Sequence, residues 1–415
     1  MKKLLIIGYV WPEPNSSAAG SRMIQLIHIF QKQDYSVTYA SPAVISEHMI
    51  NLEDLGIDKV SIELNNSSFD DYVKRLNPDV VLFDRFMMEE QFSWRVEKQC
   101  PSALRLLETV DLHCLRYARQ LAVKNGKDAF NITNLDFIND IALREVASIL
   151  RCDLSILISG YEVDVLKTIY HVNEEILLYL PFMYEAIDYD EAIKKRPAFP
   201  ERENFVTIGN FRHEPNWDSV LYLKNVIWPR VKAKLKHSEL HIYGSYPPKK
   251  AQELNNPKQG FYVKGWAANV LDTLSQYRIC LSPLRFGAGM KGKLADAMLS
   301  GTPSVTTSIG AESMFAEFNW PGIIADEPSA IAEAAVDLYN NQKKWQQCQR
   351  NGISIVNSVF SKKKNEEKFV KKLEAVITSL EKNRRNNFTG MMLRHHTMKS
   401  AMYMSQWIEE KNKFK

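Results

Sequence analysis

Short apolar runs alternate along the chain with longer stretches in which apolar residues recur at helical spacing. In the first half, the runs that we expect to form strands are residues 4–9, 36–40, 80–83, 104–107, 154–159 and 176–180. Between the first two runs, Met23, Leu26, Ile27 and Phe30 share one face of a helix expected at 21–33. This alternation predicts a parallel sheet with helices on both faces.

A second series of the same kind follows a polar, proline-punctuated stretch after residue 180, which we interpret as an interdomain connection. Its expected strands are residues 205–208, 240–243, 261–263, 279–282 and 304–307, with helices at 217–235 and 330–340. We therefore expect an α/β protein with two doubly wound domains, at residues 1–185 and 200–375, followed by a helical tail at 376–415.

The region from residue 361 onward predicts an amphipathic helix with a basic outer face. Its apolar face is formed by Phe369, Leu373, Val376, Ile377 and Leu380. Such a helix can be a solvated surface element or can contact an anionic membrane, and its lysines leave both interpretations open. These lysines are Lys362, Lys363, Lys364, Lys371 and Lys372.

The composition narrows the class of protein. Of 415 residues, 45% are hydrophobic and 25% charged, which excludes extensive disorder, and the net charge of +4 is too small to indicate a nucleic-acid partner. Five scattered cysteines without metal-ligand spacing favour a reducing compartment with neither disulfides nor a zinc site. The first apolar run lacks a signal-peptide cleavage site, and no stretch is long enough to span a membrane, so we expect a cytoplasmic protein.

The most informative chemistry lies at residues 283–307. An expected strand ends at residue 282, and Gly287, Gly289 and Gly292 precede the helix that follows. Glycines let the backbone approach a ligand closely, and the start of a helix favours an anion. This segment therefore predicts a phosphate site.

Charged side chains surround this helix start. Lys291 can neutralise a phosphate as a point charge, or it can be a solvated lysine. Lys293 and Asp296, three residues apart, can form a surface ion pair or can contact a ligand. For Asp296 the ligand contact would be a hydrogen bond to ribose hydroxyls.

The first domain repeats the arrangement in a weaker form. The first expected strand leads through a long loop to Gly20, where a helix begins. Gly20 can present backbone N–H groups to a phosphate, although a plain loop with a helix cap would look the same. Because ligands bind beyond the carboxyl ends of strands in open α/β sheets, the two helix starts could face each other across a cleft and grip one diphosphate.

Several segments resemble GT-B glycosyltransferases, and in particular the retaining, family 4-like enzymes. In the second domain these segments are IGNFRHEPNWDSV, YGSYP, VKGW and PLRFGAGMKGKLADAMLSGTPSVTTSIGAE. In the first domain they are PEPNSSAAGSR and LRLLETVDLHCLR. The resemblance implies two facing Rossmann-like domains, one on the acceptor side and one binding a nucleotide-sugar donor. It also implies no metal or other cofactor, and a C-terminal helix that crosses back to the N-terminal domain.

The resemblance implies roles for individual residues around the donor. Gly20 would contact the diphosphate from the first domain, and Gly289, Met290 and Lys291 would contact it from the second. Asp296 would take the acidic position that binds the ribose.

Other positions implied by the resemblance lie near the base and the sugar. The backbone around Gly265 and Trp266 would flank the base, and His113 matches the histidine that the family places beside the transferring sugar. Without the resemblance, Asp111 is equally an N-cap of a helix with a structural histidine next to it.

The sequence departs from the family pattern at two places. The family often has two glutamates separated by seven intervening residues, whereas here the second is Asp296 and the first position is Ala288. The arginine and lysine that commonly bind the diphosphate after the first strand of the second domain also lack clear counterparts. We expect Arg285 and Lys291 to compensate for them.

Glu89 and Glu90 follow the strand expected at 80–83, where the first domain of such a fold could contact an acceptor. Carboxylates favoured by the dipole at a helix start explain the two glutamates equally well.

These features predict a metal-independent glycosyltransferase that moves a sugar from a nucleoside diphosphate sugar to a glycan or lipid-linked acceptor, as in polysaccharide biosynthesis. One alternative is a nucleotide-sugar epimerase of the same fold. Another, motivated by Ala288, is a noncatalytic nucleotide-sugar-binding partner of a glycan-assembly complex. Peripheral contact with the inner face of a membrane is a further expectation.

Overall fold

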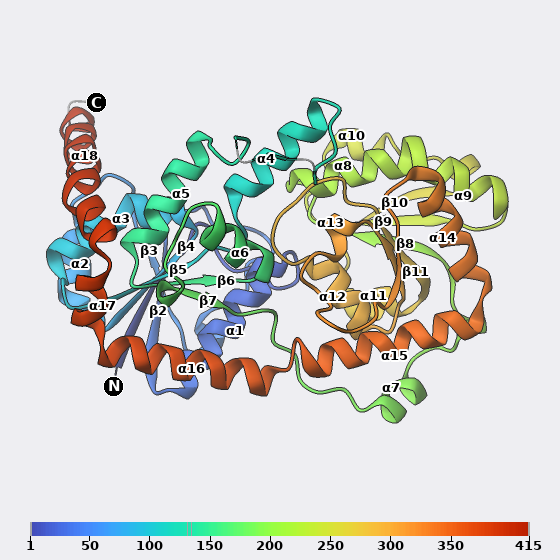
Figure 1. Ribbon diagram of the computed structural model, residues 1–415, viewed down its shortest axis with the longest axis horizontal. Coiled ribbons are helices and arrows are strands. Elements are labelled where there is room, and N and C mark those ends of the chain that lie inside the picture. The colour runs from blue at the N-terminus through green and yellow to red at the C-terminus, as the bar shows by residue number, and fades with distance from the viewer. Residues whose placement is uncertain (1, 131, 134, 414–415) are drawn as a thin grey trace.

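The chain folds into two lobes that lie side by side, each built on a parallel sheet covered by helices (Figure 1). The computed structural model describes residues 2–130, 132–133 and 135–413. The first lobe contains a seven-stranded sheet and the second a six-stranded sheet. The predicted α/β class with two doubly wound domains is confirmed.

The first lobe contains each strand that the sequence predicted for the first half of the chain, and one more. Its strands are β1 (Lys2–Ile7), β2 (Tyr35–Ser41), β3 (Asp58–Ser61), β4 (Val80–Asp84), β5 (Leu104–Glu108), β6 (Leu154–Leu157) and β7 (Leu177–Tyr179), in the order β3-β2-β1-β4-β5-β6-β7. Its helices are α1 (Ala18–Lys32), α2 (Ser68–Leu76), α3 (Phe86–Gln99), α4 (His113–Lys124), α5 (Asp140–Arg151) and α6 (Gly160–Thr168). The prediction missed β3 because this edge strand has no buried residue and therefore no apolar pattern.

The second lobe follows α7 (Tyr189–Lys195), which lies in the predicted connection. Its strands are β8 (Glu203–Ile208), β9 (Leu240–Tyr243), β10 (Phe261–Gly265), β11 (Tyr277–Ser282), β12 (Ser304–Thr306) and β13 (Gly322–Ile324), in the order β10-β9-β8-β11-β12-β13. Its helices are α8 (Glu214–Tyr222), α9 (Trp228–Lys234), α10 (Lys249–Gln252), α11 (Val270–Ser275), α12 (Gly292–Leu299), α13 (Ser308–Ala311), α14 (Pro328–Asn340) and α15 (Gln342–Ser358). The prediction missed β13, a three-residue edge strand.

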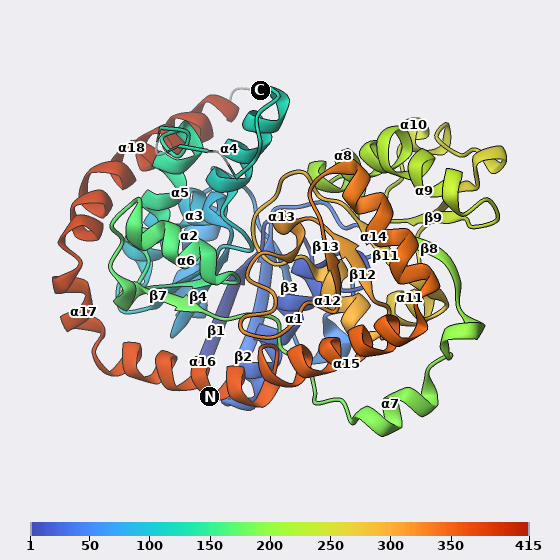
Figure 2. The ribbon, with the colours of Figure 1, turned by 45° about the vertical axis from the view of Figure 1, so that its right-hand side comes forward.

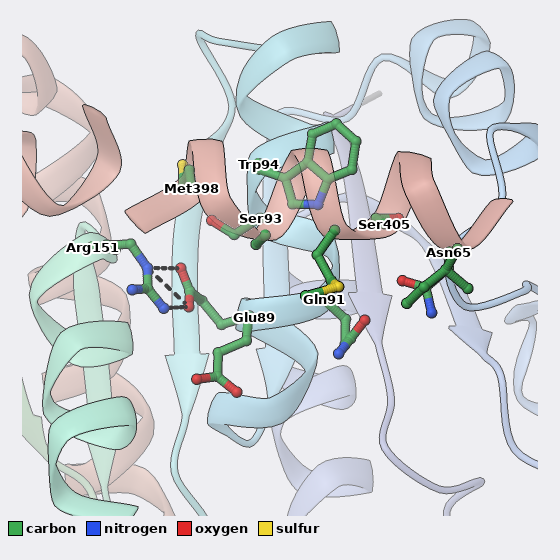
Figure 3. A pocket seen from close by; sticks show the side chains of 12 residues that line it. Asn65, Glu89, Gln91, Ser93, Trp94, Arg151, Met398 and Ser405 are labelled. Atoms are coloured by element: carbon green, nitrogen blue, oxygen red, sulfur yellow. Dashed lines mark hydrogen bonds and ion pairs between the residues drawn. The ribbon is translucent and has the colours of Figure 1, made fainter. Parts of the chain in front are cut away.

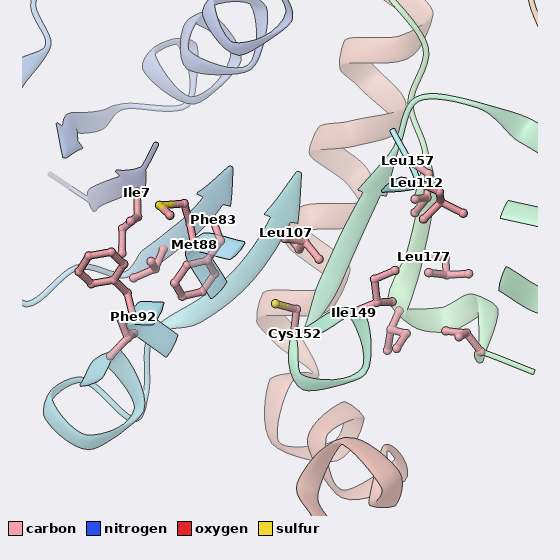
Figure 4. Packing of buried hydrophobic residues seen from close by; sticks show 14 of the residues in the cluster. Ile7, Phe83, Met88, Phe92, Leu107, Leu112, Ile149, Cys152, Leu157 and Leu177 are labelled. Atoms are coloured by element: carbon pink, nitrogen blue, oxygen red, sulfur yellow. The ribbon is translucent and has the colours of Figure 1, made fainter. Parts of the chain in front are cut away.

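Apolar side chains from adjacent strands and from the covering helices form the core of the first lobe. On one face of the sheet, Ile7, Phe83 and Leu107 belong to the same cluster as Met88 and Phe92 of α3 (Figure 4). Fully burying one such side chain stabilises a fold by about 1.5–3 kcal/mol. Because the inner strands of a parallel sheet are buried on both faces, they are largely apolar, and this is the pattern that predicted them.

In each sheet the strand order reverses beside the first strand of the lobe. β1 lies between β2 and β4, and β8 lies between β9 and β11. Where the strand order reverses, two neighbouring strands are followed by connections on opposite faces of the sheet. A crevice therefore opens between these connections, beyond the carboxyl ends of the strands. The topology thus prepares a binding crevice in each lobe.

The C-terminal helices return to the first lobe, as the resemblance implied. α16 (Lys362–Thr378) buries Phe369, Leu373 and Val376 in the apolar core of the first lobe. The domain boundary expected at residue 375 falls inside this helix. The chain therefore crosses back to the first lobe near residue 361, between α15, which packs on the second lobe, and α16.

The last two helices, α17 (Leu380–Asn386) and α18 (Phe388–Asn412), continue around the first lobe (Figure 2). α18 packs against α3 and α5. Within the described part of the chain, no helix combines the length and the apolarity needed to cross a membrane.

Candidate active site between the lobes

A cavity of about 1100 Å³ lies between the two lobes. The first lobe lines it with the loop after β1, the start of α1 and the segment before α4. The second lobe lines it with the loops after β8, β9 and β10 and with the start of α12. Ligand pockets typically measure about 300–1,000 Å³, so this cleft has room for an elongated ligand.

The starts of α1 and α12 face each other in this cleft, as the sequence predicted. A Cβ atom added to Gly292, the first residue of α12, would lie 2.3 Å from the Cβ of Ala18, the first residue of α1. Only glycine at position 292 lets the two helices approach this closely. The first-turn N–H groups of a helix have no intrahelical acceptor, so two positively polarised ends converge here.

Gly20 lies in the first turn of α1 and lines the cavity. Its N–H donates to the Ser17 side chain at 3.1 Å, and an added Cβ would lie 2.5 Å from the backbone of Glu13. Gly20 therefore allows the preceding loop to pack on the helix. The N–H groups of Ala18 and Ala19, which precede it, are the ones that a helix start leaves for a ligand.

The expected contact from Gly289 to the diphosphate does not fit the structure, because Gly289 does not line the cavity and its N–H is bonded within the protein. Gly289 has a left-handed φ of 63°, and its N–H donates to Glu162 of the first lobe at 2.8 Å. Met290 and Lys291 line the cavity, as expected. Lys291 is buried and donates from Nζ to the carbonyls of Ala288 and Gly289, and burial lowers the pKa of its ammonium group.

Two side chains of α12 also line the cavity. The Lys293 ammonium group donates to Asn216 Oδ1 at 2.8 Å, so it does not pair with Asp296. Burial lowers the pKa of Lys293 to about 8 and raises the pKa of Asp296 to about 7. Because Asn216 follows β8, Lys293 brings a positive charge to the place where the sequence showed no counterpart of the family's basic pair.

His113 begins α4 and lines the cavity. Its Nδ1 lies 3.2 Å from Glu145 Oε1 and 3.1 Å from the Asp111 carbonyl, while the Glu145 carboxylate also accepts the backbone N–H groups of His113 and Cys114. With Nδ1 donating to these oxygens, Nε2 is left for the cavity. Glu145 comes from α5, and no sequence pattern linked it to His113.

Asp111 is buried and pairs with Arg116, and both residues line the cavity. Asp84 and Arg85, at the end of β4, line the same side and also pair with each other. Burial raises the pKa of Asp84. The sequence analysis did not identify Asp84 or Arg85, although position at the end of a central strand was the available signal.

Trp266 closes another part of the cleft. Its indole N–H donates to the Asn15 carbonyl of the first lobe at 3.0 Å, and its ring stacks on His48 with centroids 4.8 Å apart. Gly265, with a φ of 79°, accepts the Gly244 N–H at 2.8 Å and sets the turn that presents Trp266. The expected base-flanking segment therefore lies at the interlobe contact.

Three side chains that the sequence predicted for the site lie away from the cleft. Arg285 is 41% exposed and pairs with Asp218 of α8. Glu89 and Glu90 line a smaller cavity of about 270 Å³ between α3 and α18 (Figure 3). There Glu89 pairs with Arg151, and Glu90 pairs with Arg144 at 2.6 Å. The structure does not bring these carboxylates to the cleft, because both glutamates face α5, which carries the two arginines.

Metal-binding side chains are not gathered anywhere in the described residues: no three His, Cys, Asp or Glu side chains are grouped to hold an ion.

Comparison with known proteins connects this geometry to a family. Residues 202–341 match the family described as glycosyl transferases group 1. The matched range lies within the second lobe and runs from β8 to α14. The matched range contains the glycine segment, both lysines and the base-flanking turn. A search of curated protein sequences gave no match.

Solved structures share the architecture of both lobes. A TarM variant from S. aureus, in complex with fondaparinux, α-GlcNAc-glycerol and UDP, is 11% identical over 90% of this chain and 99% of its own, with a TM-score of 0.67. Sucrose-phosphate synthase from Thermosynechococcus elongatus is 14% identical over 91% and 100%, with a TM-score of 0.67. HepE from Anabaena, in complex with UDP and glucose, is 12% identical over 90% and 100%, with a TM-score of 0.65. The chain thus has the GT-B fold.

Proposed function

We propose that this chain is a glycosyltransferase that moves a sugar from a nucleoside diphosphate sugar to a glycan or lipid-linked acceptor. The observation that carries the proposal is the convergence of the starts of α1 and α12, with Lys291 and Lys293, on one cavity. Two helix starts and two amines favour a ligand with several negative charges, such as a diphosphate. The glycosyltransferase group 1 match of residues 202–341 supports the same conclusion.

In the proposed reaction, an acceptor hydroxyl forms a bond to the anomeric carbon of the donor sugar while the bond from that carbon to the diphosphate breaks. The acceptor proton passes to an oxygen of the leaving diphosphate. Lys291, Lys293 and the helix-start amides stabilise the developing negative charge, and they are in place before the reaction. Because the two lysines supply positive charge, we propose that the reaction needs no metal ion.

His113 is the proposed contact to the transferring sugar. Glu145 and the Asp111 carbonyl hold Nδ1, so Nε2 is presented to the cavity in a fixed orientation. We propose retention of configuration, as in the family 4-like enzymes that the sequence resembles, with Asp296 binding the ribose hydroxyls. The structures of TarM and HepE contain UDP, which makes UDP-sugars the first donors to test.

A noncatalytic partner of a glycan-assembly complex is the second candidate, and Ala288 is the observation that favours it. Ala288 lines the cavity and packs against the apolar core of the first lobe, and its methyl group offers no carboxylate to a donor sugar. Such a protein would bind a nucleotide sugar without turning it over.

One experiment separates these candidates. The purified chain is incubated with UDP-, GDP-, ADP- and dTDP-sugars, with and without a panel of glycan and lipid-linked acceptors, and the products are identified by mass spectrometry. Nucleoside diphosphate release that depends on an acceptor supports the transferase. Sugar interconversion without an acceptor indicates an epimerase, and tight binding without turnover indicates the noncatalytic partner. Absence of any nucleotide binding contradicts all three.

We place the protein in the cytoplasm, with peripheral contact to an anionic membrane surface through α16. Lys363, Lys364 and Lys371 are exposed on this helix, opposite its buried face. The test is binding to vesicles with and without anionic lipid at low and high salt. Indifference to lipid charge contradicts the membrane contact.

A further inference from the structure

The carboxyl group of Glu162, in the first lobe, accepts hydrogen bonds from both lobes. Glu162, in the first turn of α6, is completely buried. Its Oε1 accepts the Leu112 N–H at 2.7 Å and the Gly289 N–H at 2.8 Å. Leu112 directly precedes His113, and Gly289 lies two residues before Lys291. A single oxygen atom therefore joins the segment that carries the histidine to the segment that carries the lysine.

Other first-lobe groups hold the same glycine segment. The Arg119 guanidinium donates to the Gly287 carbonyl at 2.9 Å. The side chain of Ala288 belongs to the apolar core of the first lobe. Residues 287–289 are thus part of the second lobe in sequence but are docked on the first lobe. Glu162 supplies the hydrogen-bond acceptor in this docking.

The position of Lys291 depends on the docked segment. Lys291 Nζ donates to the carbonyls of Ala288 and Gly289, so its ammonium group follows the orientation of these two residues. The N–H of Gly289 is the group that Glu162 holds. A substitution of Glu162 that lets Gly289 move would therefore also move the ammonium group of Lys291.

The chemistry of Glu162 suits a site beside a diphosphate. Burial, followed by the negative charge of Asp111, raises the pKa of Glu162 to about 8, so the group is neutral at pH 7. Among the charged groups facing it, Asp111 and Glu145 raise this pKa, and Lys291 lowers it. Its Oε2 is buried without a partner among the described residues. A neutral carboxyl group does not repel a diphosphate, whereas a carboxylate does.

We propose that Glu162 is a positioning residue of the donor site: by holding the amides of Leu112 and Gly289 on one oxygen, it sets His113 and Lys291 relative to the donor diphosphate. This inference rests on the proposed function. Glu162 thus supplies the glycine segment with a carboxyl partner from the opposite lobe. In the family pattern, a glutamate stands within this segment at the position of Ala288.

The test compares Glu162→Gln and Glu162→Ala with the wild type in calorimetric binding of UDP from pH 6 to pH 9. Glutamine keeps an oxygen that accepts both N–H groups, so we expect wild-type affinity at pH 7. In the wild type, affinity falls above pH 8 because Glu162 loses its proton and Lys293, with a pKa of about 8, loses its charge. In Glu162→Gln only the contribution of Lys293 remains, so we expect a smaller fall. Alanine leaves two buried amides unpaired, and we expect UDP affinity to fall at least about tenfold.

Asp153→Asn is the matched control. Asp153 is a buried first-lobe carboxylate that pairs with Arg384, away from the cleft. We expect this variant to lower the melting temperature without changing UDP affinity, so that lost stability and lost positioning are told apart.

Two results overturn the inference: unchanged UDP affinity in folded Glu162→Ala, or a fall above pH 8 that is as large in Glu162→Gln as in the wild type. The second result decides the matter if the alanine variant does not fold. If the wild type binds none of UDP, GDP, ADP, dTDP and pyrophosphate, the proposed function fails and the inference fails with it. If the wild type binds and the variants behave like it, only the inference fails.

Discussion

The two lysines of the interlobe cavity and the buried charges of the smaller cavity between α3 and α18 are compensated differently. In the smaller cavity, Glu89 and Arg151 form a buried ion pair with several hydrogen bonds. In the interlobe cavity, Lys291 donates to carbonyl oxygens and Lys293 to an amide oxygen, and no carboxylate within the described residues lies at ion-pair distance from either.

A buried charge paired with an opposite charge is structural, whereas a buried charge held only by neutral oxygens is available for a ligand. A neutral acceptor does not cancel a charge, so burial shifts the pKa values of Lys293 and Asp296 toward the neutral forms. An incoming diphosphate supplies the missing negative charge for the lysines. In the ion pair of Glu89 and Arg151 each charge already has a partner, so no ligand is needed to neutralise it. This pair joins α3 to α5.

The largest expected effect is on stability at the smaller cavity. Arg151→Ala leaves the buried Glu89 carboxylate unpaired, and we expect the free energy of unfolding to fall by about 3–5 kcal/mol in urea denaturation. The matched control Glu89→Leu/Arg151→Met removes both charges and should recover most of this loss. Donor affinity should not change in either variant at a temperature where both are folded. A loss of donor affinity in the double variant would show that this cavity is coupled to the cleft.

The next effect is on turnover at the interlobe cavity. Lys291→Ala removes a positive charge beside the leaving diphosphate, and we expect kcat to fall by about 10²–10³-fold. Stability should change little or increase, because no carboxylate of the described residues forms an ion pair with this buried lysine. Steady-state kinetics with the identified donor check this, with Lys363→Ala on α16 as an exposed control. Turnover within twofold of the wild type would contradict the role of Lys291.

A smaller effect is expected at Asp296. Asp296→Asn weakens the proposed hydrogen bonds to ribose, and we expect donor affinity to fall by about tenfold. Burial raises the pKa of Asp296 to about 7 in the folded protein, from an ordinary value of 3.8. Between pH 3.8 and pH 7, Asp296 is therefore protonated in the folded state and ionised in the unfolded state. Wild-type stability therefore falls as pH rises through this window, and the stability of Asp296→Asn relative to the wild type should rise. Urea denaturation at pH 4, 5.5 and 7 measures this, and a constant difference between the proteins would count against the shift.

The strands and the glycine-bearing helix starts could be predicted because both depend on local sequence. A buried parallel strand needs apolar residues on both faces, and an anion site at a helix start needs glycine and a nearby cation. The convergence of Ala18 and Gly292 followed from the rule that such sites lie beyond the carboxyl ends of strands.

The partners of these groups could not be predicted in the same way. Glu145 and Glu162 reach His113 and Gly289 only through tertiary packing, and neither belongs to a spaced motif. Glu89 showed the reverse problem: position after a central strand suggested the cleft, but the turn of α3 directs its side chain toward Arg151. Sequence reasoning located the backbone of the site better than its charges.

Arg285 offers the smallest expected effect. The sequence suggested that Arg285 compensates for the family's missing basic residues, yet it pairs with Asp218 outside the cavity and is 41% exposed. Exposed ion pairs contribute about 0–1 kcal/mol, so Arg285→Ala should lower stability by no more than this. Donor affinity and kcat should stay at wild-type values, whereas Lys293→Ala, which removes the amine beside Asn216, should weaken donor binding. If Arg285→Ala weakened donor binding and Lys293→Ala did not, the positive charge opposite the diphosphate would have to come from Arg285, and the distinction between paired and available charges would fail at this site.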